Sequence, residues 1–316
     1  MLSRDLVETL RGKRIFLTGG TGFFGKSILD YLLRHPVPDL HLRILARNCD
    51  TFREQYPELC EVPGLEFFSG DIRNFPFPSG SSDFVIHAAT PAVTTLPPGV
   101  MRSIILEGTK RALEYSAFCG AGRFLFISSG AVYGVQPSEV ERLTEEFPCQ
   151  PVTEYGKAKL EAEKLCAQSG QNVVIARCFS FIGRYLPRDL HYAAGNFLGA
   201  CEQNRPILIR GDGRTVRSYM EADDLVESLF TLLIRGQAGF LCNVGSEDPI
   251  SILDLARKLR AKYGNGNEIR ILGDPADHVS RYVPDVKRLR AIRRGEERRE
   301  PVTCTASPGQ DADKNI

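Results

Sequence analysis

The feature that most constrains the fold of this chain is a glycine-rich turn between a short apolar run and a longer helical pattern. The apolar run covers residues 14–18, and the turn follows it as Gly19-Gly20-Thr21-Gly22-Phe23-Phe24-Gly25. Gly19 permits a tight turn, Gly22 lets the backbone approach a bound group, and Gly25 lets the following helix pack closely on the strand. The order of strand, turn and helix predicts a unit that holds phosphate groups at a helix N-terminus.

Short β-rich runs continue to alternate with helical patterns through the first half of the chain. The longer segments carry apolar residues at three- and four-residue spacing, which is typical of one buried helix face. This rhythm indicates βαβ units, so the predicted fold class is α/β with a doubly wound parallel sheet of the Rossmann type. The predicted strands are 14–18, 40–46, 65–68, 84–88, 124–128, 172–177, 206–210 and 240–244, and the predicted helices are 24–33, 101–118, 155–167, 192–202 and 251–263.

The rhythm loosens after about residue 178, which suggests a second unit. We expect residues 1–178 to form a dinucleotide-binding domain, to which a segment of about 236–262 returns. Residues 179–287 are expected to form mainly a smaller α/β substrate-binding lobe, interleaved in sequence with the first domain. Residues 288–316 are rich in Arg, Glu, Pro and Ser with little apolar periodicity, so we expect a disordered tail there.

Composition and charge limit the classes of partner. The chain has 316 residues, 42% hydrophobic and 25% charged, which is enough for a large buried core. Its formal net charge of +1 offers no field for nucleic acid or an anionic membrane, and we expect neither as a partner. The nine cysteines include no Cys-x-x-Cys pair, so we expect no metal site and a reducing, cytoplasmic location. No apolar run approaches the length of a membrane span.

Residues near the glycine turn and at the end of the second strand are candidates for binding a dinucleotide. Phe23 and Phe24 open the helix whose free N–H groups would face the pyrophosphate. Arg47 and Asn48 end the second strand, where NAD-binding proteins of this topology carry an acidic residue for the ribose. Arg47 would instead pair with a 2′-phosphate, so NADP(H) is favoured over NAD(H). A solvated arginine beside bound NAD is the alternative.

The next two strand ends provide further cofactor candidates. Asp71 and Ile72 follow the third strand, where Asp71 would lie near the adenine amino group. Ala88 and Ala89 follow the fourth strand, and their small side chains would let the backbone lie close to the cofactor. Packing at the sheet end is the alternative for each pair.

Three polar residues in the middle of the chain suggest proton and hydride chemistry. Ser129 ends a predicted strand, and the carboxyl ends of strands are where open α/β sheets bind ligands. Tyr155 and Lys159 stand four residues apart on one helix face, so the ammonium is expected to lower the pKa of the phenol. We expect Tyr155 to exchange a proton with a substrate oxygen that Ser129 also binds, and Lys159 to hold the nicotinamide ribose.

Together these motifs resemble the extended short-chain dehydrogenase/reductase family, in its NAD(P)-dependent nucleotide-sugar epimerase, dehydratase and reductase branch. The resemblance implies that Ser129, Tyr155 and Lys159 form the catalytic triad, and that a nucleotide-diphosphate sugar is the substrate. It further implies a homodimer formed through helices 101–118 and 155–167. The motifs that carry it are Thr18 to Gly25, Gly70-Asp71-Ile72-Arg73, His87-Ala88-Ala89, Ser128-Ser129-Gly130-Ala131-Val132-Tyr133-Gly134, Tyr155-Gly156-Lys157-Ala158-Lys159 and Arg217-Ser218-Tyr219-Met220-Glu221-Ala222-Asp223-Asp224.

The same resemblance supplies three candidate substrate-binding residues besides Ser129. Arg217 is similar to the arginine that pairs with the substrate diphosphate, and Asn196 to a residue that meets it. Ser180 stands where many relatives carry Asn, and Ile105 and Pro275 also depart from the family pattern.

The two residues after Ser129 favour one type of reaction. Relatives that eliminate water carry an Asp-Glu pair where this chain has Gly130-Ala131, and decarboxylases carry Glu at the second position. The leading hypothesis is NADPH-dependent reduction of a nucleotide-linked 4-keto-6-deoxyhexose. The alternatives are a nucleotide-sugar 4-epimerase with tightly bound NAD, a reductase of a non-nucleotide ketone, and a non-catalytic cofactor-binding regulator.

Overall fold

The computed structural model describes residues 1–91, 96–190, 192–275 and 279–296. Its centre is a seven-stranded parallel sheet with the order β11-β6-β5-β4-β1-β2-β3. The strand order reverses between β1 and β4, which is where open α/β sheets bind ligands. The predicted α/β fold with a doubly wound parallel sheet is confirmed. The strands are β1 (Arg14–Thr18), β2 (His41–Ala46), β3 (Leu65–Ser69), β4 (Phe84–His87), β5 (Arg123–Ser129), β6 (Val173–Cys178) and β11 (Leu241–Val244).

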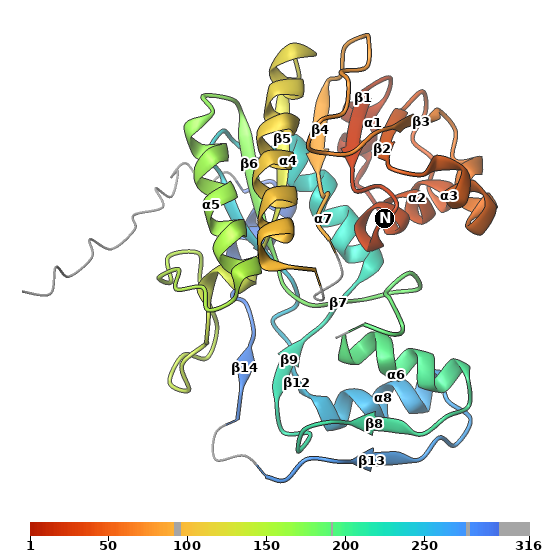
Figure 1. The fold of residues 1–316 in the computed structure, drawn as a ribbon, viewed down its shortest axis with the longest axis vertical. Helices are drawn as coiled ribbons and strands as arrows, with labels where there is room; N and C mark the ends of the chain where they lie inside the picture. The colour runs from red at the N-terminus through yellow and green to blue at the C-terminus, as the bar shows by residue number, and fades with distance from the viewer. Residues whose placement is uncertain (92–95, 191, 276–278, 297–316) are drawn as a thin grey trace, which may run out of the picture.

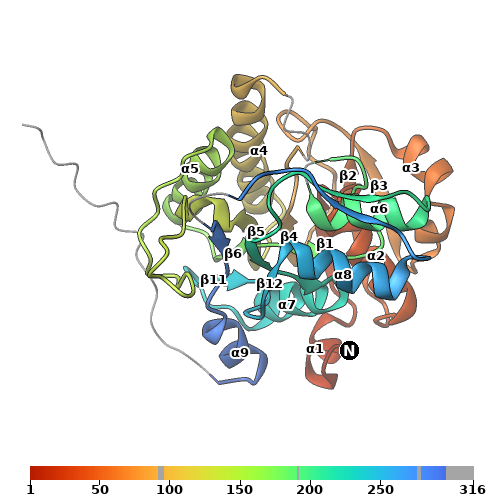
Figure 2. The same cartoon turned by 90° about the horizontal axis from the view of Figure 1, so that it is seen from below.

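Helices cover both faces of this sheet (Figure 1, Figure 2). On one face, α4 (Pro98–Phe118) and α5 (Glu154–Gln168) pack side by side. On the other face, α2 (Phe23–Arg34) packs against α7 (Ala222–Arg235), and the short α1 (Arg4–Leu10) packs on α7. The short helices α3 (Cys49–Gln55) and η1 (Pro57–Glu61) lie between β2 and β3 in the chain.

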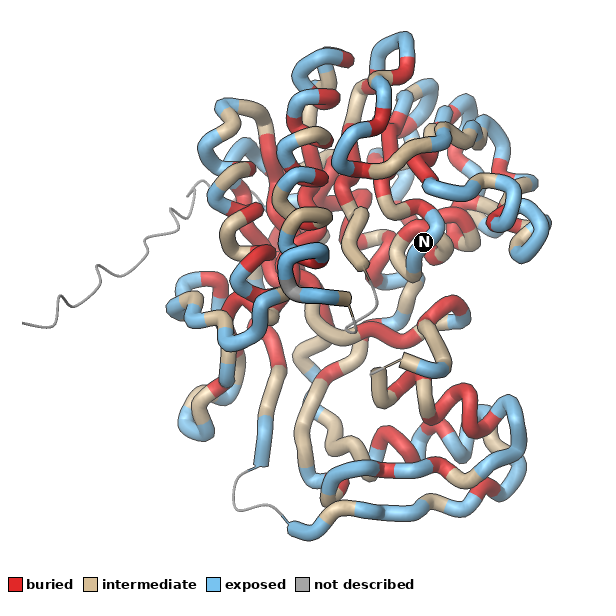
Figure 3. The backbone as a smooth tube through the Cα atoms, viewed as in Figure 1, coloured by how far each residue is buried: buried red, intermediate tan, exposed pale blue. Residues whose placement is uncertain are grey.

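Alternating side chains of the strands fill the core on each face. Ile15 and Leu17 of β1 belong to the core cluster shared with α2 and α7, whereas Phe16 belongs to the cluster shared with α4 and α5. Burial on both faces explains why the strands read as continuous apolar runs. In Figure 3 the buried backbone is concentrated in the sheet and along the inward sides of the helices.

A smaller lobe lies below the sheet in Figure 1. It contains α6 (Ala193–Glu202), α8 (Ile252–Tyr263) and a two-stranded parallel pair of β8 (Ile207–Ile209) and β13 (Ile269–Ile271). Their buried side chains form a separate apolar cluster, and Phe23 of α2 packs against its edge. The glycine turn therefore lies beside the lobe as well as beside the sheet.

Short strands connect the lobe to the sheet. β9 (Val216–Ser218) pairs with β12 (Pro249–Ser251) and β14 (Arg281–Tyr282), and β7 (Phe181–Ile182) pairs with β10 (Met220–Glu221).

The predicted returning segment of about 236–262 is divided between the two parts. β11 joins the sheet edge beside β6, as expected for the run 240–244. α8, in contrast, packs on α6 and β8, because its apolar face of Leu255, Ala256 and Leu259 is buried in the lobe cluster.

The expectation of a disordered tail from residue 288 is wrong for its first part. Helix α9 (Lys287–Arg293) packs on α7 and β11, and its residues Leu289, Ala291 and Ile292 are buried. Arg235 Nη1 donates to the carbonyl oxygens of Ile292 and Arg293, at 3.0 and 2.8 Å, and so caps the end of the helix. The remainder of the predicted tail, 297–316, lies outside the described residues.

Candidate functional site

The glycine turn lies at the end of β1, against the segment that follows β4. Gly19 has a φ of +73°, and a Cβ there would lie 2.6 Å from the carbonyl carbon of Ala88 and 2.7 Å from the nitrogen of Ala89. A Cβ on Gly25 would overlap the Cα of Gly20. Only glycine at position 25 therefore lets α2 approach the turn this closely. The result is a backbone cradle that side chains do not obstruct.

The N-terminus of α2 opens onto this cradle. Its N-cap, Gly22, provides no side-chain capping hydrogen bond, so no cap side chain covers the N–H groups of the first turn. The rings of Phe23 and Phe24 pack near Phe181, with ring centroids 6.3 and 5.5 Å apart. Free N–H groups at a helix N-terminus and a glycine cradle together fit the diphosphate of a dinucleotide.

Replacing Gly25 with Ala is expected to weaken dinucleotide binding by at least about tenfold, because the added Cβ must push α2 away from the turn. Titration with NADPH and with NADH measures the loss. The matched control is Gly122→Ala, whose Cβ would meet only the carbonyl oxygen of Asp83, at an ordinary 3.6 Å. Equal affinities for the two variants would contradict the role of the cradle.

A buried histidine fixes the segment after β4. Thr109 Oγ1 donates to the carbonyl oxygen of Ile105 at 2.6 Å, so it accepts from Nε2–H of His87 at 3.1 Å. His87 Nδ1 then accepts from the Thr18 hydroxyl at 2.7 Å, and Thr18 Oγ1 accepts from the N–H of Ala89 at 3.2 Å. This chain ties Ala89 to the end of β1. Burial lowers the pKa of His87 to about 3, so the ring is neutral at ordinary pH.

His87 makes stability depend on pH in the acid range. The folded state does not protonate this ring until about pH 3, whereas an unfolded histidine takes a proton near pH 6.5. The unfolded state therefore binds more protons in this window, and the free energy of unfolding should fall by up to about 1.4 kcal/mol per pH unit as pH drops. Urea unfolding from pH 7 to pH 4.5 should show a weaker pH dependence in His87→Gln. His41→Gln, at an exposed site, should keep the wild-type slope; an unchanged slope in His87→Gln would contradict the assignment.

The end of β2 carries the two residues predicted to meet the adenosine ribose. Arg47 is exposed, and no hydrogen bond or ion pair of its side chain is found within the described ranges. Asn48 is the N-cap of α3, where its Oδ1 accepts from the N–H of Thr51 at 3.1 Å. The Asn48 side chain thus already caps α3, whereas the Arg47 guanidinium is available for a ligand.

Asp71, predicted to lie near the adenine, is held by its neighbour. Arg73 binds both carboxylate oxygens at 2.9 Å, and this contact lowers the pKa of Asp71 to about 2. Ile72 is buried and packs over Gly108, where a Cβ would lie 3.0 Å from its side chain. An adenine would therefore have to share the Asp71 carboxylate with Arg73.

Ser129 and Tyr155 are brought together from β5 and α5. Ser129 is the last residue of β5, and its Oγ accepts from the N–H of Ala131 at 3.1 Å. Thr153 caps α5 by accepting from the N–H of Gly156 at 3.0 Å, which places Tyr155 in the first turn. Burial raises the pKa of the Tyr155 phenol above its ordinary value, and hydrogen bonding with the Ser129 side chain opposes that rise.

Lys159 lies one turn further along α5, and its ammonium binds two protein oxygens. Its Nζ donates to Thr90 Oγ1 at 2.7 Å and to the carbonyl oxygen of Ile127 at 2.8 Å, and lies 6.0 Å from the ring centroid of Tyr155. Burial is the largest cause of the shift in the Tyr155 pKa, and the expected effect of Lys159 on that pKa stays a prediction. Burial also lowers the pKa of Lys159 itself, to about 8.

A second phenol at this site was not expected from the sequence. The ring of Tyr282 on β14 packs against Phe179 at a tilt of 31°, with centroids 4.6 Å apart, and its hydroxyl fills the space where a Cβ on Gly130 would lie. Burial raises the pKa of Tyr282, and hydrogen bonding with Ser129 opposes the rise, as for Tyr155. No short motif marks Tyr282, because it stands far along the chain from the Ser129 and Tyr155 segments.

Arg217, the predicted diphosphate ligand, lies on β9 directly opposite Tyr282 in register. Its Nη1 donates to the carbonyl oxygen of Val216 at 2.8 Å, and its Nη2 to Ser280 Oγ at 3.3 Å. Burial lowers the pKa of Arg217, and no carboxylate forms an ion pair with it within the described ranges. A half-buried guanidinium without a carboxylate partner suits an anionic ligand.

The other two predicted substrate residues lie on either side of the junction between sheet and lobe. Ser180 follows β6 and is half-buried; its carbonyl oxygen accepts from the N–H of Met220 at 3.0 Å. Asn196 is half-buried in the first turn of α6, where its N–H donates to the carbonyl oxygen of Tyr192 at 3.0 Å. Their roles remain predictions.

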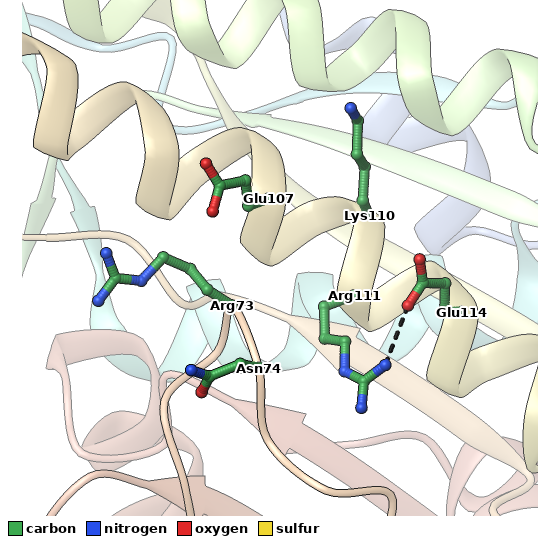
Figure 4. A pocket seen from close by; sticks show the side chains of 6 residues that line it. All are labelled: Arg73, Asn74, Glu107, Lys110, Arg111 and Glu114. Carbon is green, nitrogen blue, oxygen red and sulfur yellow. Dashed lines mark hydrogen bonds and ion pairs between the residues drawn. The ribbon is translucent and has the colours of Figure 1, made fainter.

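A hollow of about 450 Å³ lies outside this site, between α4 and the loop after β3 (Figure 4). Its arginines are already engaged, since Arg73 binds Asp71 and Arg111 binds Glu114 at 3.1 Å and the carbonyl oxygen of Phe75 at 2.7 Å. None of the predicted catalytic residues lines this hollow. The residues that line it are Arg73, Asn74, Glu107, Lys110, Arg111 and Glu114.

The part of the chain that the structure describes contains neither a helix that could span a membrane nor a candidate metal centre. None of its helices is long and apolar enough to cross a membrane. None of its His, Cys, Asp and Glu side chains gather in a group of three or more that could hold a metal ion.

Comparison with known proteins places these motifs in a family. A model of the NAD dependent epimerase/dehydratase family matches residues 15–245. UDP-glucuronic acid decarboxylase 1 of Xenopus tropicalis is 28% identical over 294 residues, which cover 89% of this chain and 67% of that protein. GDP-6-deoxy-D-mannose reductase of Pseudomonas aeruginosa is 29% identical over 306 residues, which cover 91% and 87%.

The solved structures agree in fold. UDP-N-acetylglucosamine 4-epimerase from Methanobrevibacter ruminantium M1 superposes with a TM-score of 0.78 at 20% identity, over 89% of this chain and 92% of that one. The family predicted from the motifs is thus confirmed, and its members are enzymes. Since the matched segment runs from β1 to β11 and contains the glycine turn, Ser129, Tyr155 and Lys159, the chain belongs to the NAD-dependent epimerase/dehydratase family, the nucleotide-sugar branch of the extended short-chain dehydrogenases/reductases.

Proposed function

We propose that this protein is an NADPH-dependent reductase of a nucleotide-linked 4-keto-6-deoxyhexose. The observation that carries the proposal is the end of β5, where Ser129 is followed by Gly130 and Ala131, which provide no acid or base. Elimination of water needs such groups in addition to the tyrosine, whereas transfer of a hydride and a proton does not. Tyr282 and Phe179 fill the space beside Gly130, so no larger side chain fits there.

The dinucleotide would lie across the carboxyl ends of β1, β2 and β4. The Gly19 to Gly25 turn and the N-terminus of α2 would hold its diphosphate, and Ala88 and Ala89 would line its nicotinamide half. Two of the three N–H groups of the Lys159 ammonium already donate to protein oxygens, and the third would donate to the nicotinamide ribose. When bound, the reduced nicotinamide supplies the hydride.

The protein's own residues would handle the proton. Ser129 would bind the substrate ketone oxygen, and Tyr155 would donate its phenolic proton to that oxygen as the carbinol forms. A phenol is protonated at neutral pH, as an acid in a reduction must be, and burial moves the pKa of Tyr155 further upward.

The Arg47 guanidinium is proposed to select NADPH over NADH. Arg47→Ala should weaken NADPH binding by roughly 10- to 100-fold, since a charge-assisted hydrogen bond contributes about 1.5–3 kcal/mol, and should leave NADH affinity nearly unchanged. Binding titrations with both cofactors measure this selectivity. Arg43→Ala is the control on the same strand, because Arg43 is already paired with Glu66 at 2.8 Å. Equal loss for both cofactors would argue against a 2′-phosphate contact.

The substrate lobe, mainly residues 179–287, is proposed to hold the nucleotide diphosphate beside Arg217. The half-buried guanidinium has no carboxylate partner within the described ranges, and a diphosphate would supply the missing charge. Free UDP, TDP, GDP or CDP should then compete with substrate. If none competes, a non-nucleotide ketone becomes the better candidate.

A 4-epimerase that retains NAD is the second candidate, because it needs the same triad and likewise no acid at positions 130 and 131. Denaturing freshly purified protein and identifying any released dinucleotide separates the two. Stoichiometric NAD would favour the epimerase. An NADP(H) that exchanges freely would favour the reductase.

A further inference from the structure

The ammonium of Lys159 is buried beside the proposed cofactor site without a counter-charge of its own. Lys159 is only 3% exposed, and no carboxylate lies within ion-pair distance of its Nζ in the part of the chain that the structure describes. Glu163 stands one turn further along α5, but its carboxylate already accepts from Arg177 and from Ser128. A buried cation without a counter-ion depends on hydrogen bonds to neutral oxygens.

Two such oxygens hold the ammonium. Its Nζ donates to the carbonyl oxygen of Ile127 at 2.8 Å and to Thr90 Oγ1 at 2.7 Å. The ring centroid of Phe126 lies 4.9 Å from Nζ and adds a weaker cation–π attraction. The carbonyl oxygen belongs to the main chain of β5 and is present whatever the side chain at position 127. The Thr90 hydroxyl is therefore the one of the two acceptors that a side chain supplies.

Thr90 belongs to the segment after β4 that closes the glycine cradle. The residue before it, Ala89, approaches Gly19 so closely that a Cβ on Gly19 would lie 2.7 Å from the Ala89 nitrogen. The N–H of Ala89 donates to Thr18 Oγ1 at 3.2 Å, which fixes this backbone to the end of β1. Through the Thr90 hydroxyl the same segment also holds Lys159, so it joins the cradle to α5.

We propose that Thr90 is a positioning residue, whose hydroxyl keeps the Lys159 ammonium charged and directs its remaining N–H toward the nicotinamide ribose. The inference rests on the proposed role of Lys159 at that ribose. Loss of the hydroxyl would remove one of the two oxygens that hold a cation with no counter-ion. The charged form would then be disfavoured, and the ammonium would be free to turn away from the ribose.

The first test needs neither cofactor nor substrate. Protein labelled with ¹³C at lysine Cε is titrated with base and followed by NMR, and Lys159→Met assigns the Lys159 resonance by its loss. Thr90→Val keeps the shape of the side chain and removes the hydroxyl, so the pKa of Lys159, which burial lowers to about 8, should fall by at least about one further pH unit. Thr90→Ala removes the same hydroxyl and should act in the same direction. Thr90→Ser, which keeps a hydroxyl, should retain the wild-type pKa.

The other titratable side chains around this ammonium should not change their charge in the same pH range. Burial keeps the imidazole, the phenol and both thiols among them neutral near the Lys159 pKa of about 8, and Arg177 holds the carboxylate. Thr9→Val is the distant control, because the Thr9 hydroxyl donates to the carbonyl oxygen of Asp5 within α1. The neighbouring titratable residues are His87 of β4, Tyr155, Glu163 and Cys166 of α5, and Cys178 of β6.

An unchanged pKa of Lys159 in Thr90→Val and Thr90→Ala would overturn the proposal. The same fall of that pKa in Thr90→Ser as in Thr90→Val would also overturn it, because the hydroxyl would then not be the cause.

Cofactor binding provides a separate readout. Thr90→Val should weaken binding of the preferred dinucleotide, NADPH or NADH, by roughly tenfold, and Thr90→Ser should bind it like the wild type. Unchanged affinity in Thr90→Val would overturn the directing role of the hydroxyl. A wild type that binds the dinucleotide but reduces no 4-keto sugar nucleotide would contradict the proposed function, while the titration of Lys159 and the cofactor affinity would still decide the role of Thr90.

Discussion

Replacement of Tyr155 with Phe is expected to lower turnover by about 10²- to 10⁴-fold, the usual range for the loss of a positioned general acid. The change removes only the phenolic oxygen, so the ring should keep its place in the first turn of α5. Binding of NADPH should persist, because the glycine cradle and the N-terminus of α2 are untouched. Steady-state kinetics and a cofactor titration on the same preparation measure the two effects.

Near-normal turnover in Tyr155→Phe would remove the phenol from the mechanism. Loss of both turnover and NADPH binding would show instead that the variant had disturbed the cofactor site. Tyr31→Phe is a suitable control, because Tyr31 lies on α2 on the far face of the sheet and its hydroxyl pairs with Glu227 at 3.0 Å.

The second large effect is expected at a buried ion pair beneath the site. Glu163 of α5 and Arg177 of β6 have side chains that are each 1% exposed, and Arg177 Nη2 lies 2.7 Å from Glu163 Oε2. Glu163 Oε1 also accepts from Ser128 Oγ at 2.5 Å. Glu163 thus joins the helix that carries Tyr155 and Lys159 to β6 through Arg177, and to the strand that ends at Ser129 through Ser128.

Glu163→Gln should lower the free energy of unfolding by about 3–5 kcal/mol, because it leaves the buried Arg177 cation without its counter-charge. Urea unfolding measures the loss. Glu161→Gln on the same helix is the matched control, since the Glu161 carboxylate pairs with Arg102 at an exposed position. That change should cost at most about 1 kcal/mol. Similar losses in the two variants would contradict the importance of the buried pair.

The sequence was sufficient to predict the parts of the fold that depend on local pattern. Continuous apolar runs identified the seven strands of the sheet, because parallel strands are buried on both faces. The glycine turn was predictable because the positive φ of Gly19 and the close packing at Gly25 require residues without a side chain.

Features that depend on tertiary packing were missed. The apolar face of α8 could serve either the sheet or the lobe, and only the structure shows that it packs on α6. α9 was not predicted because several arginines interrupt its apolar pattern, although Leu289 and Ile292 are buried. Two of these arginines form ion pairs, Arg293 with Glu227 and Arg290 with Glu247.

The site shows the same division. The positions of Ser129 and Tyr155 in the fold were predictable, because Ser129 ends a strand and Tyr155 lies on a helix. The contacts of Lys159 were not predictable, because the two oxygens that accept from its ammonium come from Thr90, after β4, and from Ile127 on β5. The position of Tyr282 near Gly130 could not be predicted, because it depends on the pairing of β14 with β9, which the sequence does not reveal. Preference for NADP(H), the substrate residues and the homodimer remain predictions.

The most direct test of the account is NADPH consumption with 4-keto-6-deoxyhexoses linked to UDP, TDP, GDP or CDP. We predict that one of these substrates is reduced with one NADPH oxidised for each 4-hydroxy sugar formed, and that Tyr155→Phe abolishes the reaction. No NADPH consumption with any of the four, together with interconversion of 4-epimers by protein that retains NAD, would contradict it.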